Sequence, residues 1–431
     1  MTINARILGY TAALAFIGIA VIAVVGCQKN PAAPVPAQPI IIGHQADLSG
    51  GISSWGYWLD KAAKAAVDQV NKEGGIDGRQ VKYVVEDTET DPSTGRRKLQ
   101  KLIQQHKADF VLGSTHSGVM MASLPLALEL ETPYFPVAMA SEATGPEANR
   151  FVFRINSHVR EQVQASADWV VNGEGGPLAK KWTIVVADYA WGISHEEWFG
   201  KGVEAAGGEI VKRIRVPQGT KDFVPYVSKI PADTEAVYFI FFGADSLGFI
   251  QQLHESGYSG EKYSVVCTME AIDIASLGAA AEGMWVLEYL PREMNQEKLP
   301  KELRDSFENR FHVGFRETIA VDDDGKEIGN PDRVVACSHC WATFQLVHML
   351  KDAIEESGWK SRKDNNKLIT SLEGRKLGQS MDYPQGENEI RAEDHQGFHQ
   401  HWMSKVVDGK LSVKFRIDKD KVTYAPSVDL R

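Results

Sequence analysis

Residues 40–75, IIIGHQADLSGGISSWGYWLDKAAKAAVDQVNKEGG, decide the fold that we expect. The first residues form a short apolar run that is typical of a buried strand. A helical pattern follows, in which apolar side chains from Trp55 to Val70 lie on one stripe and charged side chains lie opposite. Gly74 and Gly75 end the helix, because glycine readily adopts the left-handed conformation at a helix C-terminus. The stretch therefore predicts one strand–helix unit.

The same alternation continues along the chain. We expect strands at residues 81–86, 110–113, near Tyr134, 182–187 and 237–243, with helices between them, one beginning at Pro92 and one ending at Gly207-Gly208. Strands and helices that alternate at this spacing form parallel sheets. Because a strand–helix–Gly-Gly unit occurs in each half, the sequence predicts two α/β lobes. Parallel sheets bind ligands beyond the carboxyl ends of their strands, so we expect both lobes to face a shared cleft.

The last third of the chain is less regular. Residues 334–354 form a strongly apolar helical stretch, which we expect to pack on one of the sheets. Residues 397–406 and 411–417 alternate in polarity like edge strands. A tail of this kind is suited to return and complete the other lobe.

The N-terminus has the features of an export signal. Apolar residues 7–25 follow Arg6, and the tetrad Val-Val-Gly-Cys ends at Cys27. A basic start, an apolar core and small residues at its boundary describe a secretory signal. The tetrad resembles the lipobox of bacterial lipoproteins, in which the cysteine is acylated; an uncleaved anchor is the alternative, because about 19 apolar residues can span a bilayer. Residues 28–38 are rich in proline and predict a flexible linker.

Composition excludes several classes of function. A chain of 431 residues has room for two domains, because single cores stop growing near about 250–300 residues. Its net charge of −10 argues against nucleic acid, which is bound by clustered lysine and arginine. The sequence contains no Walker loop, no nucleophile elbow and no zinc-protease motif. We therefore expect a protein that is not an enzyme.

Five short motifs carry a family resemblance. They are GGISSWG at 50–56, VNKEGGIDG at 70–78, EDTETDP at 86–92, GSTHSG at 113–118 and RAEDHQ at 391–396. With these motifs the chain resembles the type I periplasmic binding proteins of the leucine/isoleucine/valine-binding class, over residues 40–418. The resemblance implies an α/β clamshell of two Rossmann-like lobes, each a parallel sheet flanked by helices, joined by a three-strand hinge.

The resemblance also implies a division of the chain. We expect a lipoprotein signal peptide at 1–27, a linker at 28–38, a first lobe at 39–155 and 288–390, and a second lobe at 156–287 and 391–431. Both readings of the N-terminus place the folded part outside the cytoplasm.

A ligand site between the lobes follows from the same resemblance. In the family, hydroxyls and backbone N–H groups of the first lobe hold the ligand's carboxylate, and an acid of the second lobe holds its amine. The positions that match are Trp55, Ser114, His116, Ser117, Ala138, Ser141, Trp191 and Glu270. We expect no cofactor and no metal.

The chemistry of these residues supports the assignment. A loop of Gly, Ser and Thr at a strand-to-helix junction presents hydroxyls and free N–H groups to an anion, and Ser117 is the best hydroxyl match. A buried carboxylate such as Glu270 requires a cation, which a ligand ammonium supplies. Trp55 and Trp191 offer flat walls. The alternatives are a helix cap at Ser117, core positions for the tryptophans and an exposed helix start at Glu270.

Cysteine and histidine give no sign of a metal in the sequence. Cys337 and Cys340 lie three positions apart in the apolar stretch and are interpreted as core residues; with Cys267 their count outside the lipobox is odd, so no complete disulfide framework exists. Three histidines lie close together in the sequence: His395, His399 and His401. No acid or cysteine nearby completes a metal set, so we interpret them as structural or surface histidines.

Together these observations predict an extracytoplasmic, lipid-anchored substrate-binding protein of an ABC importer. Its ligand would be a branched-chain-like amino acid or a related small polar metabolite, and its partners the membrane permease subunits. His116 and the two tryptophans depart from the family pattern and favour a ligand other than an aliphatic branched-chain amino acid. The alternative is a sensor that uses the same clamshell for a small amide, urea or aromatic acid.

Overall fold

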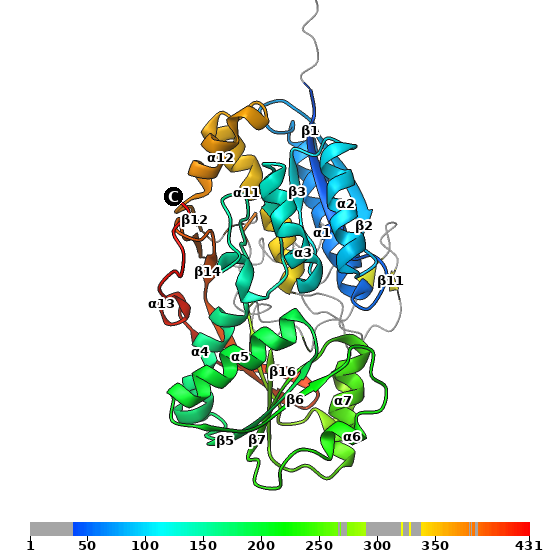
Figure 1. Ribbon diagram of the computed structural model, residues 1–431, viewed down its shortest axis with the longest axis vertical. Helices are drawn as coiled ribbons and strands as arrows, with labels where there is room; N and C mark the ends of the chain where they lie inside the picture. Colours follow the sequence, from blue (N-terminus) through cyan, green and yellow to red (C-terminus); the bar gives the residue numbers. More distant parts are fainter. Residues whose placement is uncertain are drawn as a thin grey trace, which may run out of the picture. The chain divides into compact units, whose positions relative to one another are not determined.

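The computed structural model describes residues 38–265, 268, 274–289, 320–321, 327–328, 338–378, 380, 382–383 and 387–431. Residues Gln38–Arg431 form one compact unit. Among the described residues no helix has both the length and the apolar character that crossing a membrane requires. Figure 1 shows the arrangement of the helices and strands.

The first sheet has four parallel strands in the order β2-β1-β3-β4. Its elements, in chain order, are β1 (Ile40–Ala46), α1 (Ser53–Lys72), β2 (Val81–Asp87), α2 (Pro92–Gln104), β3 (Phe110–Leu112), α3 (Ser117–Glu129), β4 (Tyr134–Phe135) and the 3-10 turn η1 (Ser141–Thr144). We call this sheet and its helices the first lobe. The expected strand–helix alternation is confirmed here.

Helix α1 shows how local sequence produces this lobe. Its apolar stripe, which includes Trp55 and Val70, is buried. Gly74 and Gly75 follow with φ of +108° and +81°, and the N–H of Gly75 donates to the carbonyl of Val70 at 2.8 Å. A Cβ on Gly75 would lie 2.1 Å from the carbonyl oxygen of Arg79, so this position has room only for glycine.

The second sheet has seven strands in the order β16-β15-β9-β8-β7-β5-β6. Its elements are α4 (Val159–Asn172), β5 (Lys181–Ala187), α5 (Ala190–Ala205), β6 (Glu209–Val216), α6 (Val224–Val227), β7 (Ala236–Ile240), α7 (Gly243–Glu255), β8 (Glu261–Val265), η2 (Ala275–Ala280), β9 (Trp285–Glu288), β15 (His401–Val407) and β16 (Lys410–Ile417), followed by α13 (Lys419–Val422). Strands β5 to β9 pair in parallel, and β15 pairs antiparallel with both β9 and β16. This sheet and its helices are the second lobe.

The second lobe corrects three expectations. The strand expected at 237–243 ends at Ile240, because Gly243 already begins α7. Strand β6 was not expected, since half of its side chains are charged and exposed at the sheet edge. The edge strand expected at 397–406 is two strands in the structure: β14 (Gly397–His399) lies at the edge of a three-stranded sheet, whereas β15 lies between β9 and β16 and is almost wholly buried. The strand expected at 411–417 is β16, which lies at the edge of the second sheet.

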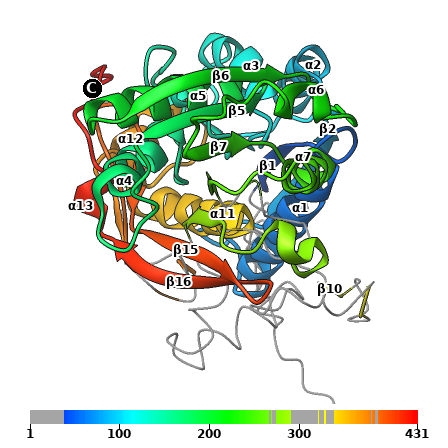
Figure 2. The ribbon, with the colours of Figure 1, turned by 90° about the horizontal axis from the view of Figure 1, so that it is seen from below.

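The remaining elements lie beside the first lobe or between the sheets. They are β10 (Ala320–Val321), β11 (Glu327–Ile328), α11 (Ser338–Ser357), η3 (Arg362–Asp364), α12 (Asn365–Leu372), β12 (Lys376–Leu377), β13 (Asn388–Ile390) and β14 (Gly397–His399). Helix α11 packs mainly against α1 and α12, as Figure 2 shows for α1, and its buried side chains share one apolar core with β1 and β3 of the first sheet. Cys267 and Cys337 lie outside the described residues, and the side chain of Cys340 is not described.

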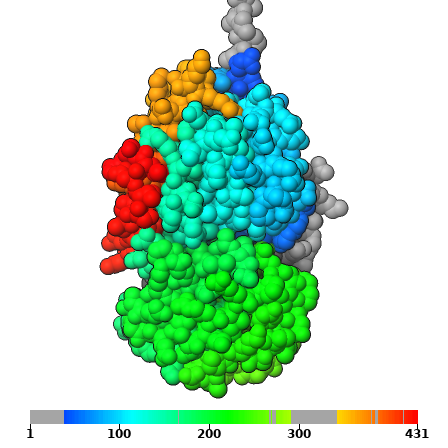
Figure 3. Space-filling model, in the orientation of Figure 1, coloured from blue at the N-terminus to red at the C-terminus, as the bar shows by residue number. Residues whose placement is uncertain are grey.

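Two crossings between the sheets lie side by side. The N–H of Arg154 donates to the carbonyl of His395 at 3.0 Å, and the N–H of Gly397 donates to the carbonyl of Arg154 at 2.7 Å. On the face shown in Figure 3 the surfaces of the two lobes meet without a gap. The predicted lobe boundaries stay a prediction, as does the third crossing, much of which lies outside the described residues.

Candidate ligand-binding site

The buried carboxylate of Asp47 fixes the loop that precedes α3. Asp47 follows β1 and accepts hydrogen bonds from Ser114 Oγ at 2.8 Å, the N–H of Thr115 at 2.9 Å and the N–H of His116 at 3.3 Å. The hydroxyl of Thr88 also donates to it. The sequence predicts free N–H groups for an anion in this loop. Two of them are bound by the protein's own carboxylate, which corrects that expectation.

Ser114 consequently helps to hold the loop in place and does not point a free group at a ligand. Its single hydroxyl hydrogen is donated to Asp47, and its oxygen accepts from the N–H of His116 at 2.9 Å. Ala138 is engaged as well, because its N–H donates to the carbonyl of Ser114 and its carbonyl accepts from Arg154. Neither residue presents a free donor to a ligand in this arrangement.

His116 presents a donor that has no acceptor among the described residues. Its Nδ1 accepts from the N–H of Val119 at 3.3 Å and caps α3, so the cap is His116 and not Ser117. Burial lowers the pKa of His116, so the ring is neutral at pH 7. With Nδ1 as acceptor, the hydrogen is on Nε2. Nε2 is buried and has no hydrogen-bond partner among the described residues.

Ser117 and Ser141 lie at neighbouring turns of the first lobe. Ser117 Oγ accepts from the N–H of Ala140 at 3.2 Å, and nothing in the described part of the chain accepts its hydrogen. Ser141 connects the lobes, because its N–H donates to Ser194 Oγ of α5 at 3.3 Å. Its own Oγ accepts from the N–H of Arg160 at 2.9 Å. Of the two, Ser117 is the hydroxyl with a hydrogen to give to a ligand.

Aromatic side chains from both lobes meet beside this loop. We call Trp55, His116, Tyr189, Trp191 and Phe242 the aromatic cluster. Trp55 of the first lobe lies 5.6 Å from Phe242 of the second, between ring centroids. Tyr189 and Trp191 lie 6.0 Å and 6.1 Å from Phe242. The two predicted tryptophans therefore belong to one cluster that spans both lobes.

Sequence reasoning missed Tyr189 and Phe242. Each is the second residue after a strand of the second lobe, β5 or β7, and the residue before a helix. The rule that parallel sheets bind ligands at the carboxyl ends of their strands would have selected them. Their aromatic character would then have marked them as walls of the site.

Further polar groups that follow strands β3, β5, β7 and β8 lack partners in the described part of the molecule. They are Thr115 Oγ1, Trp191 Nε1, Ser246 Oγ and Thr268 Oγ1, all buried. Buried polar atoms are nearly always hydrogen-bonded in native proteins, so such a group of atoms is typical of a place where a ligand binds. Glu270, the predicted amine-binding acid, lies outside the described residues, as does Cys27.

The three histidines of the C-terminal segment are all buried, which excludes the surface alternative and leaves the structural one. His395 is structural: its ring stacks on Phe153 with centroids 3.8 Å apart. His399 and His401 lie beside Glu161. Nothing in the sequence connects this acid with the histidines, because it is far from them along the chain. The prediction that no acid completes a set of metal ligands with these histidines is therefore wrong.

Two α/β lobes that meet around hydrogen-bond donors and aromatic walls define a clamshell binding protein. Residues 39–410 match the family model described as periplasmic binding protein, and the chain belongs to this family. A curated relative, Leu/Ile/Val-binding protein homolog 3 of Brucella melitensis, is 28% identical over 223 residues, which are 51% of this chain and 58% of the relative. The chain thus matches somewhat more than half the length of this relative.

Solved structures share the fold. A solute-binding protein of an ABC transporter from R. palustris, in complex with benzoate, has a TM-score of 0.73 at 20% identity and covers 88% of this chain and 97% of its own. The branched-chain amino acid transporter substrate-binding protein of Streptococcus pneumoniae, in complex with isoleucine, has a TM-score of 0.69 at 18% identity, covering 88% and 99%. At these identities the likeness concerns the fold alone.

Proposed function

We propose that the protein is the extracytoplasmic substrate-binding protein of an ABC importer and that its ligand is a small carboxylate. The observation that carries this proposal is the Nε2–H of His116, which is buried within the aromatic cluster and has no acceptor in the described part of the chain. A carboxylate oxygen accepts such a hydrogen bond, and a charged acceptor makes the bond stronger. Family membership supports the role of solute capture.

The remaining groups specify the rest of the ligand. Ser117 O–H and Trp191 Nε1–H are further donors for the carboxylate oxygens. The aromatic cluster supplies apolar walls for a hydrocarbon or aromatic body. An amino acid would also have its amine held by Glu270, whereas an aromatic acid would not need that residue. Benzoate and isoleucine, the ligands of the two solved relatives, have the carboxylate in common.

Two parts of the proposal concern the membrane. Acylation at Cys27 would tether the protein, and the linker at 28–38 would hold the lobes away from the lipid surface. The closed form would dock on the permease subunits after hinge motion around the ligand.

A ligand screen tests the function. Tag-free protein, refolded from denaturant to remove ligand carried through purification, is screened by thermal shift against amino acids, aromatic acids and the matched uncharged amides. A carboxylate at 100 times its dissociation constant should stabilise the fold by about 2.7 kcal/mol. Small-angle scattering should then show a smaller radius of gyration. Equal binding of an acid and its amide would exclude the carboxylate proposal.

Import and sensing are separated by a transport measurement in cells. Loss of the protein should abolish uptake of the radiolabelled ligand at low concentration if the protein serves an importer. Normal uptake together with a lost transcriptional response would favour the sensor.

A further inference from the structure

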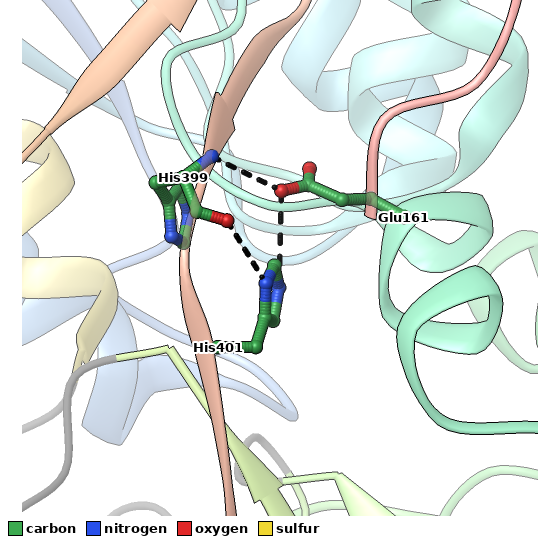
Figure 4. Close-up of side chains that lie close together, drawn as sticks. All are labelled: Glu161, His399 and His401. Carbon is green, nitrogen blue, oxygen red and sulfur yellow. Dashed lines mark hydrogen bonds and ion pairs between the residues drawn. The ribbon is translucent and has the colours of Figure 1, made fainter. Parts of the chain in front are cut away.

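Glu161, His399 and His401 form a buried cluster outside the ligand site. Glu161 lies on α4, His399 ends β14 and His401 begins β15, so the cluster joins a helix of the second lobe to the segment that crosses between the sheets. Figure 4 shows the carboxylate of Glu161 directed at the stretch of backbone that carries both histidines. One ligand atom from each residue lies within 4.8 Å of the other two, and each side chain is 0% exposed.

Hydrogen bonds to carbonyl groups fix the tautomers of both histidines. His399 Nδ1 lies 2.9 Å from the carbonyl oxygen of Gln400, and His401 Nδ1 lies 3.1 Å from the carbonyl oxygen of His399. A carbonyl oxygen only accepts, so Nδ1 carries the hydrogen in both rings. The lone pair of each ring is then on Nε2. A histidine that binds a metal commonly has this arrangement, with its other N–H donated to a carbonyl.

The acid and one histidine of the cluster lack sufficient partners. Among the described residues, Glu161 Oε1 accepts a single long hydrogen bond, 3.5 Å, from the N–H of His399, and it lies 3.8 Å from His401 Nε2. Glu161 Oε2 and His399 Nε2 are buried and have no hydrogen-bond partner in the described part of the chain. A buried carboxylate is costly unless it is paired, and here no lysine or arginine forms an ion pair with it among the described residues. A cation bound by Glu161 and His399 would satisfy both atoms.

We propose that Glu161, His399 and His401 bind one divalent transition-metal ion, with zinc as the best match. Two imidazole nitrogens and a carboxylate oxygen are a common zinc ligand set, with bonds of about 2.0–2.2 Å and a fourth position left for water. Ligand atoms on a tetrahedral ion lie about 3.4 Å apart. The side chains therefore need to close by roughly an ångström. The ion would link α4 to the crossing segment and so support the join between the lobes.

Ser157 competes with the ion for one ligand atom. Its hydroxyl lies 2.7 Å from His401 Nε2 and, since that nitrogen has the lone pair, donates to it. The hydroxyl must rotate away when a metal binds. Removing this hydroxyl should therefore leave metal binding as tight as in the unchanged protein, or tighter.

The test uses the tag-free chain and zinc itself. The protein is dialysed against EDTA, unfolded, and refolded with or without zinc chloride, because a fully buried site can fill during folding. After desalting, mass spectrometry of the elements should find about one zinc per chain. Cobalt in place of zinc should give the visible absorption bands of a tetrahedral ion. If the protein retains no zinc after purification and takes up none on refolding, the proposal is overturned.

Matched variants locate the ion. His399→Gln and Glu161→Gln should weaken zinc binding by more than about tenfold, a loss that even the outer partners of metal sites cause. His395→Gln is the control, because His395 is equally buried and has its Nδ1 3.1 Å from the carbonyl of Val152, but lies outside the cluster. Ser157→Ala is the variant that should retain zinc if a ligand variant fails to fold. Unchanged zinc content in folded His399→Gln, or equal loss in His395→Gln, would contradict the assignment.

Discussion

The imidazole of His116 lies flat on the ring of Tyr189, with 5.1 Å between ring centroids and 6° between ring planes. His116 caps α3 in the first lobe, and Tyr189 precedes α5 in the second. Rotation of the lobes away from each other would separate these rings. The stack therefore joins the two lobes, and it places the Nε2–H of His116 at their junction.

We expect His116→Phe to weaken a carboxylate ligand by at least about tenfold, or 1.4 kcal/mol. Phenylalanine retains a ring for the stack on Tyr189 but has no N–H, and a hydrogen bond to a charged group contributes about 1.5–3 kcal/mol. Isothermal calorimetry with the ligand found by screening measures the change. The control is His106→Phe, at a half-buried histidine bound to Glu86. Equal affinity in His116→Phe would remove His116 from the site.

Asp47→Asn should lower the free energy of unfolding by at least about 2 kcal/mol, because an amide cannot accept from all the donors that converge on this carboxylate. Ser114→Ala should cost about 1 kcal/mol, since it removes one of these bonds. Urea unfolding measures both changes. Asp68→Asn, on the exposed side of α1, should leave stability unchanged. If Asp47→Asn is as stable as the unchanged protein, the carboxylate does not hold the loop.

The sequence was sufficient for β1 and α1 because their signals are local: a short apolar run, an apolar stripe and two glycines. It was not sufficient for the loop at Ser114, whose partner Asp47 is 67 positions away. Glu161 and His399 are 238 positions apart and meet only because the chain crosses between the sheets beside α4. Sequence spacing carries no information on such pairs. The aromatic residues after β5 and β7 could have been predicted, because parallel sheets bind ligands at the carboxyl ends of their strands.

Glu270→Gln distinguishes an amino acid from an acid without an amine. If Glu270 holds a ligand ammonium, the variant should weaken an amino acid by at least about tenfold, since truncating one partner of a desolvated charge pair costs about 2–5 kcal/mol. Ser117→Ala should instead weaken any carboxylate. Calorimetry with both variants provides the comparison. An unaffected Glu270→Gln would favour an anionic ligand with no positive group.

His195 should make the fold sensitive to acid. Burial lowers the pKa of His195 to about 3, so between pH 6.5 and that value the unfolded chain binds a proton that the folded protein does not. The free energy of unfolding therefore falls as the pH drops below 6.5, by about 1.4 kcal/mol per pH unit for this group. His195→Gln should reduce the loss between pH 7 and pH 5 by roughly 2 kcal/mol in urea unfolding. The exposed His254→Gln should show the same loss as the unchanged protein.

Cys27→Ser tests the membrane tether. If Cys27 is acylated, the variant should move from the membrane fraction to the soluble fraction, as immunoblotting of fractionated cells would show. Retention in the membrane with an intact N-terminus would establish an uncleaved anchor instead.

Strands β15 and β16 have a consequence for the order in which the protein is made. They complete the second sheet from the far end of the chain, and β15 pairs along the whole of β9. Until residues 401–417 have been synthesised, β9 has an unpaired, buried-type edge of the kind that pairs with other chains. The second lobe therefore cannot finish folding until residues 401–417 have been made. Between the synthesis of β9 and that of β15, the open edge of β9 is available for pairing with other chains.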